Sequence, residues 1–318
     1  MADSSVGWGT PAHVEALQQA AAGGDSDAMY NLGVLAVERN PPNVGSARRW
    51  YVQAAALGNV RAMVNLGSLF AERVEPPDFV SAQLWWERAA AGGVIAAMFN
   101  LGVLFAEQHD PPDLAAARRW WERAAAAGEA GAMFMLGVLL SERLDSPDPS
   151  GAGHWFEKAA AEGDLRAMLK LAGHAERRQP PDLTAARRWL EQAATRGHRG
   201  AMYSLGQLLA DRVDPPDFAA ARHWYEQAAT AGDVEAMYNL GVLLSTRMDP
   251  PDLAAARQWW ERAAAAGDHN AIYNLGALSA SLLNPPDLAA ARYWYQQLVA
   301  VEHPAAGRLL ELIQRQER

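Results

Sequence analysis

The chain has 318 residues, half of them hydrophobic, no cysteine, and a formal net charge of −9 at pH 7. This hydrophobic fraction is enough for a continuous core, and the lack of cysteine excludes disulfides and thiol chemistry. The acidic balance argues against a general affinity for nucleic acid or for anionic membranes.

The N-terminal residues are polar, and we expect residues 1–10 to form a disordered segment. From Pro11, the sequence HVEALQQAAAGG matches the end of a helix pattern that recurs later, with Leu17 at a position of the aromatic pair. We therefore expect an N-terminal half-repeat that caps the array.

A unit of 34 or 35 residues then recurs eight times. Its Ala-Met anchor, once Ala-Ile, marks each copy, and the anchors lie at Ala28, Ala62, Ala97, Ala132, Ala167, Ala201, Ala236 and Ala271. A fixed period in this range is typical of a solenoid, in which each unit packs on its neighbours. The sequence predicts an all-α solenoid of eight antiparallel helix hairpins over residues 11–318. With two capping half-repeats this makes 18 helices in a single domain.

The first half of each unit is predicted to be a helix with a glycine inside it. In the seventh copy Leu240 and Leu243 recur at helical spacing, and Gly241 follows Leu240. A glycine inside a helix costs about 1 kcal/mol relative to alanine. Its recurrence therefore predicts that a second helix crosses there with no space for a side chain. The fifth copy has Ala172 at this position.

A Pro-Pro-Asp element ends the first helix, because proline lacks the backbone N–H and clashes with the preceding turn. Asp252 then stands at the N-cap position of a second helix. This helix carries an aromatic pair, Trp259 and Trp260 in the seventh copy. Adjacent residues on a helix point about 100° apart, so one ring is predicted to fill the hairpin core. The other should pack toward a neighbouring repeat or the groove wall.

An Ala-Gly pair ends the second helix, with the glycine at the C′ position. The aspartates that follow are predicted N-caps of the next first helix, and they are Asp164, Asp233 and Asp268. Beyond the eighth copy, residues 304–318 form a last amphipathic helix. It carries the polar outer face of a terminal cap.

Two central copies depart from the pattern. In the fourth, Gly151 and Gly153 should weaken the start of the second helix. The fifth has one residue fewer between Met168 and Asp182 than the third has between its equivalents, and we place this loss within the first helix. Such departures indicate sequence drift, a bend, or a functional site.

The residues that carry chemistry do not form a catalytic pattern. The eight histidines are scattered, and there is no His-Glu-x-x-His, phosphate-binding glycine loop or Gly-x-Ser-x-Gly motif. The Asp-Pro-Pro-Asp loops are acidic but lack the glycine turn and ligand spacing of a calcium loop. We therefore expect no enzyme activity, no metal site and no cofactor.

The recurring run A-x-x-W-[WY]-E-x-A-A-x-x-G-x-x-x-A-M-[YF]-x-L-G resembles the Sel-1-like repeat, a relative of the tetratricopeptide repeat. The resemblance spans roughly residues 11–310. Family members usually carry a glycine-rich turn where this chain has Pro-Pro-Asp, and the disulfide-bearing subgroup is excluded. The resemblance implies a right-handed superhelix of hairpins that binds proteins, with the first helices lining its concave face.

An asparagine precedes Leu-Gly in five copies, and these residues are Asn31, Asn65, Asn100, Asn239 and Asn274. By resemblance to tetratricopeptide repeats, asparagine at this site can bond the backbone of a bound peptide. The alternative is a bond to a neighbouring helix end or turn. The aromatic residue before this position is groove wall or core, and it is found as Tyr30, Phe99, Phe134, Tyr203, Tyr238 and Tyr273.

The asparagine series is interrupted at Met135, Lys170 and Ser204. Between Asp164 and Gly200 eight residues are basic and four are acidic, a local charge of +4. Arg166 and Lys170 are four apart and share one face of a helix. They resemble the basic residues of tetratricopeptide domains that grip a terminal carboxylate. We expect an acidic segment to bind across the fourth to sixth copies, although a solvated charged face would give the same pattern.

The sequence favours a non-enzymatic adaptor that binds a protein or peptide segment in the concave groove. The alternatives are a structural spacer or oligomerising array, and an enzyme or metalloprotein built on the repeats.

Only two of the 28 basic residues are lysine, which together with the many alanines indicates a bacterial source. Neither a signal peptide nor a run of 18 apolar residues is present, so we expect a cytoplasmic monomer that binds neither nucleic acid nor membrane.

Overall fold

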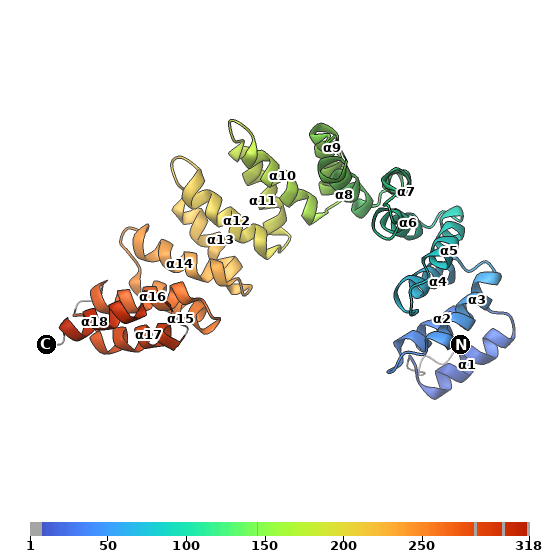
Figure 1. Cartoon of the computed structure of the whole chain (residues 1–318), viewed down its shortest axis with the longest axis horizontal. Helices are drawn as coiled ribbons and strands as arrows, with labels where there is room; N and C mark the ends of the chain where they lie inside the picture. Colours follow the sequence, from blue (N-terminus) through green and yellow to red (C-terminus); the bar gives the residue numbers. More distant parts are fainter. Residues whose placement is uncertain (1–7, 145, 283–284, 301–302, 317–318) are drawn as a thin grey trace, which may run out of the picture. The chain divides into compact units, whose positions relative to one another are not determined.

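The computed structural model describes residues 8–144, 146–282, 285–300 and 303–316. Within these residues the regular structure is entirely helical, with 18 α-helices and no strand, as predicted. The chain divides into two compact units, Met1–Asp164 and Leu165–Arg318. In each unit the helices follow one another in chain order and pack on their neighbours in the chain (Figure 1).

Each repeat contributes a first and a second helix. The N-terminal unit contains α1 (Pro11–Ala22), α2 (Ser26–Glu38), α3 (Val44–Ala56), α4 (Val60–Glu72), α5 (Phe79–Ala91), α6 (Ile95–Glu107), α7 (Leu114–Ala126), α8 (Ala130–Val138) and α9 (Pro149–Ala161). The C-terminal unit contains α10 (Leu165–Arg177), α11 (Leu183–Thr195), α12 (Arg199–Gln207), α13 (Phe218–Thr230), α14 (Val234–Thr246), α15 (Leu253–Ala265), α16 (His269–Ala277), α17 (Leu288–Ala300) and α18 (Ala306–Gln316). Helices α8, α12 and α16 continue as π-helical turns, η1 (Leu139–Arg143), η2 (Leu208–Arg212) and η3 (Leu278–Leu282). The even-numbered helices from α2 to α16 are the first helices, and the odd-numbered helices from α3 to α17 are the second helices.

The glycine of each first helix lies against the second aromatic residue of the pair. A Cβ on Gly102 would lie within 3.0 Å of the Trp121 indole, which is itself fully buried. The same holds in every copy that has the glycine, for the pairs Gly33–Tyr51, Gly67–Trp86, Gly137–Phe156, Gly206–Tyr225, Gly241–Trp260 and Gly276–Tyr295. The predicted close helix crossing is therefore confirmed, and lack of space selects glycine here.

The fifth copy changes both sides of this contact. Ala172 stands at the glycine position and Leu190 at the aromatic position, and both are buried. A methyl group is added on one helix where a ring is replaced by a smaller side chain on the other. The two changes compensate in volume, which is the substitution pattern that packed cores tolerate best.

The first aromatic residue of each pair is only half-buried. In four copies a cation three residues further along the same helix covers its exposed ring face. Arg123 lies 4.5 Å from the centre of the Trp120 ring, and Arg262 lies 4.6 Å from that of Trp259. The expectation that one ring of the pair fills the hairpin core is confirmed.

The predicted helix caps are present. The Asp252 carboxylate accepts a hydrogen bond from the N–H of Ala255 at 2.9 Å, at the start of α15. Asp233 and Asp268 accept in the same way at the starts of α14 and α16, at 3.0 and 2.7 Å. Asp164 directly precedes α10. Because these bonds satisfy otherwise unpaired N–H groups, each aspartate fixes where a helix begins.

The glycines that end the second helices are selected for a different reason. Gly128 and Gly267 have φ values of +90° and +94°, and no atom lies within 4 Å of the position a Cβ would occupy. This left-handed backbone region is costly for residues with a Cβ. The conformation, rather than crowding, therefore requires glycine at these C′ positions.

The residue missing from the fifth copy is not lost from its first helix, which corrects the prediction. Helices α10 and α6 both have 13 residues. The N–H of Asp182 bonds to the carbonyl of Ala175, and that of Asp113 bonds to the carbonyl of Phe105. Ala175 and Phe105 are each the eleventh residue of their helix. The segment from this residue to the capping aspartate is therefore one residue shorter in the fifth copy than in the third.

We expect Gly153→Ala to raise the free energy of unfolding by about 0.5–1 kcal/mol. Gly153 lies within α9, which forms at full length, and no atom lies within 4 Å of the position a Cβ would occupy. Amide hydrogen exchange at the start of α9 should be faster than in α7 or α15, and it should slow in the variant.

Gly128→Ala is the matched control for this prediction. Its Cβ would also meet no atom, but its φ is positive. The same substitution should therefore destabilise the protein at Gly128. Equal effects of the two variants, or uniform exchange in all second helices, would contradict the assignment of α9 as a weak point.

Residues 1–7 lie outside the described part of the chain, so the expected disorder of residues 1–10 is not tested there. The next residues are placed against the first two helices. The indole N–H of Trp8 donates to a carboxylate oxygen of Glu38 at 3.0 Å, and its ring lies 5.3 Å from that of His13. Thr10 caps α1 by accepting from the N–H of His13. These contacts hold residues 8–10 over the start of α1.

Candidate functional site

The five asparagines before Leu-Gly are all half-buried on the first helices. The side-chain amide of Asn65 donates to the Tyr51 hydroxyl at 3.2 Å, and that of Asn239 donates to the Tyr203 hydroxyl at 3.1 Å. Both partners are tyrosines of the preceding copy, rather than a helix end or turn. In the part of the chain that the structure describes, Asn31, Asn100 and Asn274 make no side-chain hydrogen bond.

The tyrosine that holds Asn65 is a neutral group at physiological pH. Burial raises the pKa of Tyr51 to about 12, with the Asn65 hydrogen bond acting in the opposite direction. The oxygen of its hydroxyl accepts the hydrogen bond from the Asn65 amide. Because the bond uses an amide N–H, it leaves the Oδ1 atom of Asn65 available to accept from a ligand.

Asn65 lies at a hollow between two first helices. The hollow has a volume of about 200 Å³, and it is lined by Val37, Tyr51, Asn65, Ser68, Leu69, Glu72 and Arg73. Two of the aromatic residues before the asparagine position lie against the core and are still partly exposed. The rings of Tyr30 and Tyr203 lie 6.0 and 6.1 Å from the buried rings of Tyr51 and Tyr225, yet both remain half-exposed.

Arg166 and Lys170 lie on α10, one turn apart, as predicted. Arg166 is exposed and Lys170 is half-buried, and both residues already interact with other groups of the protein. Other basic residues of the fifth copy are paired. Arg187 contacts Glu191 at 2.7 Å, and Arg178 contacts Asp182 at 3.7 Å. Part of the local positive charge is therefore neutralised within the same helix or cap.

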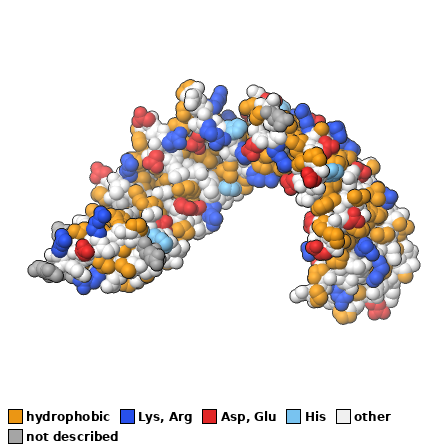
Figure 2. Space-filling model, in the orientation of Figure 1, with side chains coloured by type: hydrophobic (Ala, Val, Ile, Leu, Met, Phe, Trp, Pro, Cys, Tyr) orange, Lys and Arg blue, Asp and Glu red, His pale blue; other side chains and the backbone are white. Residues whose placement is uncertain are grey.

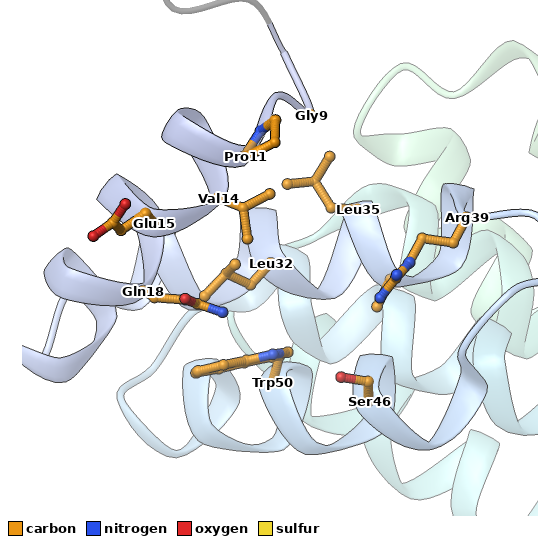
Figure 3. A pocket seen from close by; sticks show the side chains of 11 residues that line it. Gly9, Pro11, Val14, Glu15, Gln18, Leu32, Leu35, Arg39, Ser46 and Trp50 are labelled. Atoms are coloured by element: carbon orange, nitrogen blue, oxygen red, sulfur yellow. The ribbon is translucent and has the colours of Figure 1, made fainter.

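A larger pocket, which the sequence analysis missed, lies between α1, α2 and α3. Its volume is about 650 Å³, and it is lined by Gly9, Pro11, Val14, Glu15, Gln18, Leu32, Leu35, Ala36, Arg39, Ser46 and Trp50. Figure 3 shows Val14 of α1 and Leu35 of α2 pointing toward one another over Trp50 of α3. Arg39 lies on one side of these apolar residues and Glu15 on the other. No motif marks this pocket in the sequence, because it lies where Val14 and Ala36 are smaller than their equivalents in most later copies.

The described residues contain no group of three or more His, Asp or Glu side chains that could hold a metal ion. Among the same residues, no helix is long and apolar enough to span a bilayer. Figure 2 shows acidic and basic side chains interspersed with hydrophobic ones on the visible surface of each unit.

Tandem antiparallel hairpins joined by a repeated glycine–aromatic contact define an α-helical repeat protein. Comparison with known families matches eight copies of the Sel1 repeat, at residues 26–59, 60–94, 95–129, 130–164, 165–198, 200–233, 234–268 and 269–299. The chain belongs to the Sel1 repeat family. Proteins of this family are generally protein-interaction scaffolds rather than enzymes.

Two solved structures are similar over almost the whole chain. One is c5321, a protective antigen of uropathogenic Escherichia coli with the same repeat fold, at 23% identity and a TM-score of 0.72, covering 95% of this chain and 67% of that one. The other is a Sel1 repeat protein from Oxalobacter formigenes, at 26% identity and a TM-score of 0.67, covering 96% and 92%. Among curated protein sequences nothing matches.

Proposed function

We propose that this chain is a non-enzymatic adaptor that binds a protein or peptide segment along its first helices. The observation that supports this most is the hollow beside Asn65, where a tyrosine hydroxyl holds the amide and leaves its Oδ1 atom to accept from a peptide N–H. The same residue type recurs at Asn31, Asn100, Asn239 and Asn274. A row of such groups suits an extended backbone, which offers N–H donors at regular intervals.

The proposal also covers the charge of the ligand, the extent of the repeat domain, the cellular location and the oligomeric state. Arg166 and Lys170 share one face of α10, and their positive charge suits an acidic segment. We also propose that residues 11–318 act as one repeat domain, and that the protein is a cytoplasmic bacterial monomer.

The test begins with capture of partners from the source bacterium, using the full chain as bait. A peptide covering the captured segment is then titrated against wild type and the Arg166→Glu, Lys170→Glu variant. Charge-assisted hydrogen bonds contribute about 1.5–3 kcal/mol, so the double reversal should weaken binding at least tenfold. Binding to wild type should also weaken as salt is raised, because salt screens exposed charges.

Arg187→Glu is the matched control, since Arg187 lies on the second helix α11 and is paired with Glu191. It should leave the affinity unchanged. Equal affinities of wild type and double variant at low and high salt would place the peptide elsewhere.

A further inference from the structure

At the pocket between α1, α2 and α3, helix α1 lacks a feature that four later second helices have. In α7, α11, α13 and α15, an arginine and a glutamate four residues apart form ion pairs of 2.7–2.8 Å. Counted back from the glycine that ends each helix, these positions are Val14 and Gln18 in α1. A short apolar side chain thus replaces a long paired one at the mouth of the pocket.

The floor of the pocket is opened by a second replacement. Ala36 is the eleventh residue of α2, and its equivalents in other first helices are larger in five copies, namely Phe70, Phe105, Leu140, Leu209 and Leu244. The loss of a large side chain at one position leaves volume that neighbouring groups only partly recover. Leu35 and the half-buried Trp50 line the space that remains.

The polar group at one side of the pocket has also lost its partner. Two of the arginines equivalent to Arg39 reach back to the preceding first helix. Arg143 donates to the carbonyl of Ala106 at 2.9 Å, and Arg212 lies 3.4 Å from Glu176. Among the described residues α1 alone precedes α2, and there the Arg39 side chain makes no hydrogen bond or ion pair and is exposed.

These features define the chemistry of an occupant. Val14, Leu35 and Trp50 offer an apolar surface, and the Arg39 guanidinium with the Ser46 side chain offers an anion partner beside it (Figure 3). Gln18 and Glu15, on the other side, can bond amide N–H groups. A volume of 650 Å³ is in the range of pockets that hold small ligands or single side chains.

We propose that this pocket binds the C-terminal apolar residue of a polypeptide. The apolar side chain lies on Leu35 and Trp50, the terminal carboxylate pairs with Arg39, and the peptide N–H groups bond to Gln18 and Glu15. The site is separate from the first-helix face that carries the proposed function, so either can bind without the other. A small aromatic acid offers the same apolar group and carboxylate. The experiment distinguishes such an acid from the C-terminus of a polypeptide.

The experiment titrates the full chain with three probes, followed by NMR of 15N-labelled protein. The probes are the peptide Gly-Gly-Ser-Gly-Phe with a free carboxylate, the same peptide as its C-terminal amide, and N-acetyl-phenylalanine. The free peptide should shift the Trp50 indole N–H signal and bind at least tenfold more tightly than the amide. It should also bind at least tenfold more tightly than N-acetyl-phenylalanine, which lacks the additional N–H groups.

Two variants locate the site. Arg39→Gln should reduce affinity for the free peptide at least tenfold without changing that of the amide. Val14→Arg with Gln18→Glu restores the ion pair of later repeats and should abolish binding, with circular dichroism confirming an intact fold. Arg73→Gln, the equivalent of Arg39 in the second copy, and the Arg166→Glu, Lys170→Glu variant should both bind the peptide as wild type does.

Specific results would overturn the proposal. Equal binding of the acid and the amide, or unchanged binding in Arg39→Gln, would remove the role of Arg39. Affinity for N-acetyl-phenylalanine as high as for the peptide would assign the pocket to small aromatic acids instead. No binding of any probe at millimolar concentration would show that the pocket is not a ligand site.

Discussion

Gly102→Ala is expected to lower the free energy of unfolding by up to about 2 kcal/mol, although alanine is the better helix former. The helix preference favours the variant by about 1 kcal/mol. Against it, the new Cβ would lie within 3.0 Å of Trp121, whose ring is fully buried and cannot move aside freely. Overpacking of such a core costs about 1–3 kcal/mol and sometimes more. Chemical denaturation followed by circular dichroism measures the change.

The fifth copy supplies the partner substitution for this prediction. Trp121→Leu alone should destabilise the hairpin by leaving a cavity. Combined with Gly102→Ala it reproduces the buried Ala172 and Leu190 of the fifth copy. The double variant should therefore be more stable than the sum of the single effects by about 1–2 kcal/mol, as contacting residues show. Simple additivity would mean that the glycine is required for a reason other than the facing ring.

Excision of Ala236–Asn270 is expected to give a shorter chain that still folds. The deletion removes Gly241 together with Trp260, so no hairpin loses half of its core contact. It also brings Ala271 to the third position after Asp233, where Asp233 can cap the new first helix as it now caps α14. The helical signal per residue should stay as in wild type, and unfolding should remain cooperative.

Deletion of α15 alone, Leu253–Ala265, is the control for this excision. It removes fewer residues, but it takes Trp260 away from Gly241 and exposes the apolar face of α14. This variant should aggregate or lose helicity, as size-exclusion chromatography and circular dichroism would show. If the whole-repeat deletion also aggregated or lost helicity, the repeats would not be interchangeable units.

The hairpin contact could be predicted from sequence because it conflicts with local preference. Glycine is a poor helix residue, so its recurrence at Gly102 and Gly241 needed a tertiary reason, and the aromatic pair supplied one. The caps could be predicted for a similar reason, because Asp252 and Asp268 stand beside helix-breaking residues. In both cases the signal lies within one repeat and recurs in several.

Other features could not be predicted from sequence, because they depend on contacts between repeats or on a side chain or residue that is missing from one copy. Asn65 and Asn239 bond tyrosines at two different repeat positions, Tyr51 and Tyr203, so no single spacing predicts both. The pocket beside α1 arises from the small side chain of Val14, and an isolated valine gives no signal of its own. The residue missing from the fifth copy was misplaced because sequence spacing cannot distinguish a shorter helix from a shorter loop.

The ion pairs along the second helices have a consequence for how such a gene can change. In α7, α11, α13 and α15 the arginine and glutamate that pair belong to the same helix, four residues apart. Unequal recombination between two copies in the coding DNA therefore inserts or removes both members of a pair at once. Each of these arginines keeps its glutamate partner after such an event. The number of repeats is therefore free to vary between descendants of one ancestral gene.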